Sequence, residues 1–303
     1  MIINTRSIVL RVFSFSILPE GAVILTANIT RVIVLEEGDN MGNLANFNEV
    51  LYHTGLSTAM IENAEYAILP GDPGRVEVLA KAFGEAEFIA SHREYTSWLT
   101  HINSKAILVC STGMGGPSVS IGMEELARIG VKKFIRVGTT GSIQEHIKLG
   151  EVVINKAAVR LDGASRHYAP IEFPAVASLE LTNALVVAAA EVKAPYHVGI
   201  SVSSDTFWPG QERYDSFTGY VPRALQGSLQ EWQALGASNY EMETATLFVV
   251  AQSMGLDAGS ICGVVAQRTQ DEHVASPDIY QLASERFILV VKRALFNMTK
   301  EGK

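Results

Sequence analysis

The sequence has little cysteine and no excess of positive charge. Its two cysteines, Cys110 and Cys262, each lie in an apolar run that favours a buried strand, so we expect neither a disulfide framework nor a cysteine metal site. The formal net charge of −8 argues against a nucleic-acid partner, because such proteins carry a basic surface. The low cysteine content is typical of a reducing compartment, and we expect a cytoplasmic protein.

Long apolar runs and metal-ligand spacings are also absent. No run reaches the roughly 18–20 residues that span a membrane, and Arg11 interrupts the one run that resembles a secretory signal. The histidines show no i, i+4 or H-E-x-x-H spacing, so no zinc site is expected. Hydrophobic residues make up 48% and charged residues 18% of the 303 residues, which indicates a globular protein with a sizeable core.

The N-terminal segment differs from the rest of the chain. Residues 1–45 show no clear period of 2 or 3.6, and we expect an extension outside the fold, followed by one catalytic domain at 46–303. Met41 stands just before the well-patterned sequence, so the working protein is hypothesised to begin there.

Beyond Tyr66, β-rich runs alternate with amphipathic helical patterns. The strands are predicted at 67–70, 106–110, 133–138, 151–154, 197–203 and 260–265, and the helices at 76–83, 118–129, 179–192, 244–254 and 280–296. This alternation predicts a single domain of the α/β class, with no linker or internal repeat after residue 45.

Three glycine-rich segments follow predicted strands, where ligands bind in α/β folds. They are 70–75, which contains Gly71 and Arg75; 111–118; and 136–142, which places Arg136 at a strand end beside hydroxyls. None has the spacing of a P-loop or a dinucleotide fingerprint. Glycines and arginines together favour an anion site of phosphate size. A structural ion pair is the alternative for Arg136.

Two carboxylates flank Met242. Glu241 and Glu243 would diverge on a helix but share one side of an extended segment, where they would suit the vicinal hydroxyls of a sugar. An acid and nucleophile pair of a glycosidase is the alternative, although it leaves the anion site without a purpose.

The loop 207–213 combines an aromatic ring, an amide and a guanidinium. Phe207, Gln211 and Arg213 surround a Pro-Gly turn, and the donors and acceptors of the last two fit the edge of a pyrimidine. A solvated surface turn is the alternative.

In combination these segments resemble the hexameric, bacterial purine and uridine nucleoside phosphorylases, and the uridine type in particular. The resemblance runs from about residue 52 to 294 and is carried by the motifs GDPGR, SHREYTSW, STGMGGPS, RVGTTGS, RLDGASRHYAP, SSDTFWPGQERYD, NYEMETATL and VVAQRTQDE. It implies a single α/β domain whose mixed central sheet is partly barrel-like and flanked by helices.

The resemblance also implies a role for each matching residue. Phosphate would be bound by Gly71, Arg75, Arg136, Thr139 and a neighbour's Arg93; ribose by Thr139, Glu241, Met242, Glu243 and a neighbour's His53; uracil by Thr140, Gly141, Phe207, Gln211 and Arg213. A potassium ion would lie between paired subunits at Glu94, Met114 and Ser118. The implied assembly is a homohexamer, a trimer of dimers with shared active sites.

The implied reaction is reversible phosphorolysis of uridine to uracil and α-D-ribose 1-phosphate, in pyrimidine nucleoside salvage or catabolism. Inorganic phosphate is the co-substrate and no organic cofactor is expected; Arg136, Gln211 and Arg213 are the expected catalytic residues. Two alternatives remain. A purine phosphorylase is expected to carry an aspartate where Ala266, Gln267 and Arg268 stand, and a non-catalytic relative is expected to lack anion-site residues.

Overall fold

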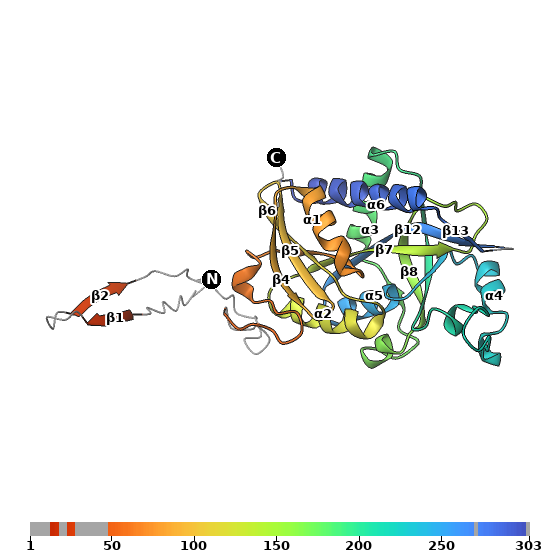
Figure 1. Cartoon of the computed structure of the whole chain (residues 1–303), viewed down its shortest axis with the longest axis horizontal. Coiled ribbons are helices and arrows are strands. Elements are labelled where there is room, and N and C mark those ends of the chain that lie inside the picture. The colour runs from red at the N-terminus through yellow and green to blue at the C-terminus, as the bar shows by residue number, and fades with distance from the viewer. Residues whose placement is uncertain (1–12, 18–22, 28–47, 270–271, 301–303) are drawn as a thin grey trace, which may run out of the picture. The chain divides into compact units, whose positions relative to one another are not determined.

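The computed structural model describes residues 13–17, 23–27, 48–269 and 272–300, which fall into two units, Met1–Leu44 and Ala45–Lys303. In the first unit β1 (Phe13–Ile17) pairs antiparallel with β2 (Val23–Ala27) (Figure 1). The sequence pattern does not predict this hairpin. The assignment of residues 1–45 to an extension outside the catalytic fold stays a prediction.

The second unit is built on one mixed sheet. Its strands are β3 (Tyr66–Pro70), β4 (Ala86–His92), β5 (Tyr95–Ile102), β6 (Lys105–Cys110), β7 (Lys133–Ser142), β8 (Val152–Leu161), β9 (Ala175–Val176), β10 (Tyr196–Ser204), β11 (Asn239–Glu241), β12 (Asp257–Arg268) and β13 (Glu272–Val274). The six predicted strands correspond to β3, β6, β7, β8, β10 and β12. The hairpin of β4 and β5 and the short strands were not predicted.

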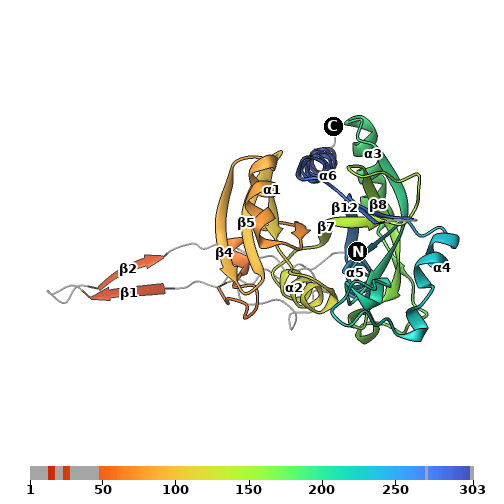
Figure 2. The same ribbon diagram turned by 45° about the vertical axis from the view of Figure 1, so that its right-hand side comes forward.

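Five strands of this sheet close into a ring. β12 pairs with β7 in parallel and with β8 antiparallel, and the order β8, β10, β11, β7 completes the circuit. From β7 the sheet continues through β3 and β6 to the hairpin of β5 and β4 (Figure 2). The prediction of a mixed, partly barrel-like sheet in one α/β domain is therefore confirmed.

Helices cover the sheet. They are α1 (Val76–Phe83), α2 (Gly116–Arg128), α3 (Leu179–Glu191), α4 (Ser228–Ala234), α5 (Thr244–Ser253) and α6 (Pro277–Met298), with 3-10 turns η1 (Thr58–Met60), η2 (Pro73–Arg75), η3 (Ala164–His167), η4 (Pro209–Gln211) and η5 (Arg223–Leu225). The predicted helices match within about three residues at each end, and α4 is the addition. None of the helices in the described residues is long and apolar enough to cross a bilayer.

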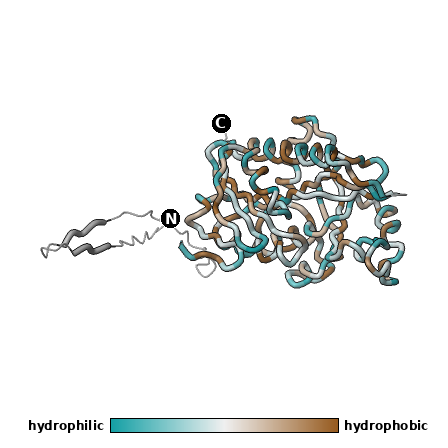
Figure 3. The backbone as a smooth tube through the Cα atoms, viewed as in Figure 1, coloured by the Kyte–Doolittle hydropathy of each residue, from teal (hydrophilic) through white to brown (hydrophobic). Residues whose placement is uncertain are grey.

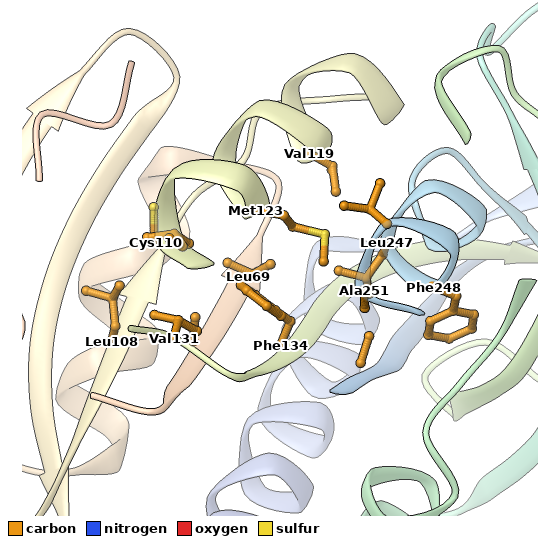
Figure 4. Packing of buried hydrophobic residues seen from close by; sticks show 14 of the residues in the cluster. Leu69, Leu108, Cys110, Val119, Met123, Val131, Phe134, Leu247, Phe248 and Ala251 are labelled. Carbon is orange, nitrogen blue, oxygen red and sulfur yellow. The ribbon is translucent and has the colours of Figure 1, made fainter. Parts of the chain in front are cut away.

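The core lies between these layers. Met123 of α2 and Leu247 of α5 pack with Leu69 and Phe134 of the sheet (Figure 4), and α1, α3 and α6 bury a second cluster. Apolar and polar residues alternate along α6, whose brown and teal segments stand out in Figure 3. Both cysteines are buried and free, as predicted.

Candidate active site

Arg136 connects the phosphate and sugar segments that the sequence predicted separately. It lies in β7, and its guanidinium forms ion pairs with Glu243, through Nη2, and with Glu241, whose Oε2 is 3.3 Å from Arg136 Nε. All three side chains are buried. The two carboxylates therefore do point to one side, because Glu241 ends β11 and Glu243 precedes α5.

One detail of the prediction for Arg136 is wrong. It does not stand at a strand end, because β7 continues to Ser142 and pairs with β12 over Thr139, Thr140 and Gly141. The ion pair considered as an alternative is present. Nevertheless Arg136 Nε has no partner of hydrogen-bond geometry among the described residues, so the guanidinium retains a free donor.

Glu241 and Glu243 differ in how much of their hydrogen-bonding capacity is used. Glu241 accepts from the amides of Glu243 and Thr244, at 2.9 and 2.8 Å, and from the hydroxyls of Ser201 and Ser203. Glu243 accepts from the amides of Gly115, at 2.7 Å, and Met242, at 3.3 Å. Four contacts fix Glu241 at the start of α5, whereas Glu243 is held by the glycine turn and Arg136.

The pKa values of this cluster follow from burial and charge. Burial opposes the charge of Arg136, but Glu243 and Glu241 outweigh it and raise its pKa above the ordinary value. Burial, together with the charge of Glu241, raises the pKa of Glu243. The two carboxylates therefore favour the charged form of Arg136 in spite of its burial.

The three glycine-rich segments converge here. A Cβ at Gly71 would lie 2.9 Å from the carbonyl oxygen of Gly113, and one at Gly138 would lie 2.9 Å from Arg136 Nη2. A side chain at Gly71 would push the backbones of the 70–75 and 111–118 turns apart, and one at Gly138 would displace the end of the Arg136 side chain, so both glycines keep the turns and the guanidinium in place. Backbone amides and guanidinium groups therefore gather in one place.

Arg75 adds a second cation. It closes η2, and its Nε and Nη1 are buried without a hydrogen-bond partner in the described residues. Burial is the main cause that lowers its pKa, and the charge of Arg136 contributes to the lowering. Two guanidinium groups that repel each other and retain free donors are suited to bind an anion between them.

The loop 207–213 forms a second part of the site. Arg213 is buried and stacks on Phe207, with Cζ 4.2 Å from the ring centroid, and its Nη1 donates to Glu272. Gln211 is also buried, at 4% exposure, and no hydrogen bond to its side chain occurs in the described part of the chain. The solvated-turn alternative does not hold for Gln211 and Arg213, because solvated side chains would be exposed. Phe207 itself is half-exposed.

Two residues near this loop were not assigned from the sequence. Arg268 donates from Nη1 to the carbonyl oxygen of Gln211 at 2.8 Å, and Glu272 holds Arg213 while its Oε2 lies 3.5 Å from Arg268 Nε. The contacts of Arg268 with Gln211 and of Glu272 with Arg213 join positions more than 50 residues apart, so no local sequence pattern predicts them. Thr140, predicted to contact the base, donates to the carbonyl oxygen of Tyr240 and accepts from Asn239.

His53 and Arg93 gather elsewhere, on an exposed patch. The rings of Tyr52 and His53 pack edge to face, and the guanidinium of Arg93 lies over the Tyr52 ring. Arg93 Nη2 also donates to the Tyr52 hydroxyl at 3.2 Å. Glu125 of α2 accepts from His53 Nδ1 at 2.7 Å. No contact joins His53 or Arg93 to Arg136 among the described residues. This placement is compatible with donation to another subunit.

The residues of the expected potassium site lie close together. Ser118 Oγ donates to the carbonyl oxygen of Met114 at 3.3 Å, and a Cβ on Gly113 would lie 3.0 Å from Glu94 Cγ. The Glu94 carboxylate, the Met114 carbonyl and the Ser118 hydroxyl offer hard oxygen ligands. Asp162 accepts from the amide of Ser165 at 2.7 Å, and Asp205 accepts from the amide of Gly163 at 2.6 Å, so both carboxylates are used in hydrogen bonds within the protein. In the described ranges no group of three or more His, Cys, Asp or Glu could hold a metal.

A cavity of about 230 Å³ lies apart from these residues. Its lining includes His146, Lys156, His197 and Ser238 and none of the predicted site residues. We locate the site from the converging charged groups, because the chemistry of a small polar substrate depends on them and not on volume.

Comparison with known proteins shows the family of the chain. Residues 65–295 match the family model described as the phosphorylase superfamily. Uridine phosphorylases of Salmonella typhimurium and Escherichia coli K12 are each 51% identical to this chain over 244 residues, covering 80% of this chain and 96% of the relative. A guanosine phosphorylase of Halorubrum lacusprofundi is 36% identical over 200 residues, or 66% of this chain and 77% of that protein. The chain therefore belongs to the phosphorylase superfamily.

Proposed function

We propose that this phosphorylase catalyses the reversible phosphorolysis of uridine to uracil and α-D-ribose 1-phosphate, in pyrimidine nucleoside salvage or catabolism. The observation that carries the proposal is the Arg136 ion pair with Glu241 and Glu243, which places two carboxylates beside an arginine whose Nε makes no hydrogen bond among the described residues. A reaction between phosphate and a nucleoside needs hydrogen-bond donors that bind the phosphate next to hydrogen-bond acceptors that bind the sugar hydroxyls. The similarity to uridine phosphorylases supports the choice of base.

In this proposal phosphate binds to Gly71, Arg75, Arg136 and Thr139, and ribose to Thr139, Glu241, Met242 and Glu243. Since Glu241 already has four hydrogen-bond donors, its part is mainly to orient Arg136 and the start of α5. Glu243 keeps more acceptor capacity for a ribose hydroxyl. Phosphate attacks C1′ from below and the configuration there inverts.

Uracil binds to Thr140, Gly141, Phe207, Gln211 and Arg213. As the bond from C1′ to N1 lengthens, positive charge develops on the ribose and negative charge on the base. Phosphate stabilises the first, and the donors of Gln211 and Arg213 stabilise the second. Arg213 Nε is buried without a hydrogen-bond partner among the described residues, which supports this role.

Further parts of the proposal concern the assembly. Arg93 and His53 complete the phosphate and ribose sites of a neighbouring subunit, within a homohexamer built as a trimer of dimers. Potassium binds at Glu94, Met114 and Ser118. Residues 46–303 form the catalytic domain, and the protein works in the cytoplasm.

The test follows ultraviolet absorbance with uridine, inosine and guanosine, each with and without phosphate. We expect loss of uridine only when phosphate is present, with release of uracil and ribose 1-phosphate. Phosphate-independent release of uracil would instead indicate a glycosidase, and preference for inosine or guanosine would indicate a purine phosphorylase. No reaction with any of the three would contradict phosphorolysis.

A further inference from the structure

Glu212 lies between the two proposed base-binding residues but points away from them. Its backbone has φ 52° and ψ 48°, the left-handed region that a residue other than glycine seldom adopts. Because of this turn, the side chains of Gln211 and Arg213 are buried while the Glu212 side chain points away from them. The strained residue is therefore the point where the loop reverses.

The Glu212 carboxylate caps helix α4. It accepts hydrogen bonds from the amides of Gly227, at 2.5 Å, and Leu229, at 2.7 Å. The residue before α4 is Gly227, which has no side chain to do this. Since the first amides of a helix lack partners within it, Glu212 supplies acceptors that the local sequence does not.

Helix α4 is connected in turn to Arg268. The side-chain amide of Gln233 donates to the carbonyl oxygen of Arg268 at 3.2 Å. The guanidinium of Arg268 then donates to the carbonyl oxygens of Gln211, at 2.8 Å, and Glu212, at 3.4 Å. The contacts form a closed circuit from the loop through α4 and β12 back to the loop.

We propose that Glu212 is a positioning residue for base recognition, which fixes Gln211 and Arg213 through α4 and Arg268. The inference rests on the proposed function, because it takes these two residues as the ones that bind uracil. Glu212 itself does not touch the substrate. It acts by holding a loop whose side chains must keep their places as charge develops on the base.

The test compares Glu212→Gln with wild type. A glutamine keeps the size, but its NH2 group would face one of two amide donors, so the cap is weakened. We expect kcat/KM for uridine to fall at least about tenfold, with KM for phosphate changed less than about twofold. Glu231→Gln is the matched control, because this exposed carboxylate on α4 makes no side-chain hydrogen bond or ion pair in the described residues. It should match wild type.

A double-mutant cycle separates positioning from general damage. If Glu212 acts through Gln211 and Arg213, Glu212→Gln should cost less than about twofold once both of these residues are alanine, because the groups it positions are gone. Gln233→Ala removes the hydrogen bond from α4 to the carbonyl oxygen of Arg268 and leaves Glu212 unchanged. It should lower kcat/KM for uridine in the same selective way, but by a smaller factor. The inference would be overturned if Glu212→Gln lowered kcat/KM by the same factor in the alanine background as in wild type. It would also be overturned if Glu212→Gln affected the constants for uridine and phosphate equally. Wild-type protein without uridine phosphorolysis would overturn the proposed function and this inference together.

Discussion

At the scale of single residues, the site is defined by buried arginine nitrogens that make no hydrogen bond among the described residues, although Arg136 Nε faces Glu241 at 3.3 Å. Nε of Arg75, Arg136 and Arg213, and Nη1 of Arg75, are all buried without hydrogen bonds in the part of the chain described. A buried donor without a partner costs about 1–3 kcal/mol, and more for a charged group. Such a cost is retained where a ligand supplies the missing acceptors.

Phosphate should therefore stabilise the folded protein through Arg75. At phosphate concentrations near 100 times Kd the expected gain is about 2.7 kcal/mol in the free energy of unfolding. Arg75→Ala should lose most of this gain, whereas Arg128→Ala, which removes an exposed arginine at the end of α2, should keep it. Thermal unfolding with and without phosphate gives the comparison. An equal stabilisation by phosphate in both variants would show that Arg75 does not bind phosphate.

Arg213 should affect the base and not the phosphate. Arg213→Ala removes the donor proposed to stabilise the leaving uracil, so kcat/KM for uridine should fall about 100- to 1,000-fold while KM for phosphate stays within about threefold. The matched control is Arg223→Ala, which removes an exposed arginine of η5. Steady-state kinetics with each substrate varied in turn gives both constants. Equal losses for uridine and phosphate would contradict the assigned role.

At the scale of elements, the sequence predicts what repeats locally and misses what depends on distant partners. The amphipathic helices were predicted to within about three residues of their ends, and all six predicted strands exist, but β7, β8 and β12 run several residues beyond the predicted apolar cores. The turn between β4 and β5 was not, because it is made by Arg93 at φ 55° instead of the glycine or asparagine that usually marks such a turn. The spacing of Glu241 and Glu243 showed that they share a side, but not that Arg136, over 100 positions earlier, lies there.

Helix α2 anchors the segment that carries His53. The ionised Glu125 carboxylate accepts from the backbone amides of His53 and Thr54 and from the His53 ring. Burial opposes this charge, but the hydrogen bonds from Thr54 and His53 outweigh it and lower the pKa of Glu125. Glu125 therefore contributes stability above the ordinary carboxyl pKa of 4.5, and this is lost as the pH falls through its folded-state value.

Glu125→Gln should consequently destabilise the protein in a pH-dependent way. We expect a loss of about 1–3 kcal/mol at neutral pH, because hydrogen bonds to a charged acceptor are replaced by weaker ones. The difference from wild type should shrink as the pH falls below about 4.5, because the unfolded carboxyl then binds a proton while the folded one does not, and it should be gone below the lowered folded-state pKa. Urea unfolding across this range measures it, with Glu87→Gln on the exposed side of β4 as control. A difference independent of pH would show that the charge is not what Glu125 contributes.

At the scale of the whole molecule, the two units of the chain make the N-terminal boundary testable. The family match begins at residue 65, and every predicted site residue lies between His53 and Glu243. A variant that starts at Met41 should therefore unfold at the same temperature as the full chain and cleave uridine at the same rate, within about twofold. A clear loss of either would show that residues 1–40 belong to the working protein.

The exposed patch of His53 and Arg93 allows a test of assembly. If each subunit lends Arg93 to its neighbour, a chain with Arg93→Ala and a chain with Arg213→Ala damage different sites when they pair. In a mixed pair one site receives both substitutions and the other receives neither. Random pairing then leaves about a quarter of all sites intact, since half of the pairs are mixed and one site in two is native.

Co-expression of the two chains with different tags should restore uridine phosphorolysis to about that fraction of wild-type activity in the doubly purified complex, although each variant alone is weak. Light scattering on the same material gives the size of the assembly, for which we expect six subunits. Activity no higher than the sum of the separate variants would mean that Arg93 serves its own subunit. The free surface position of Arg93, stacked on Tyr52, would then need a movement of the turn after β4 to reach phosphate.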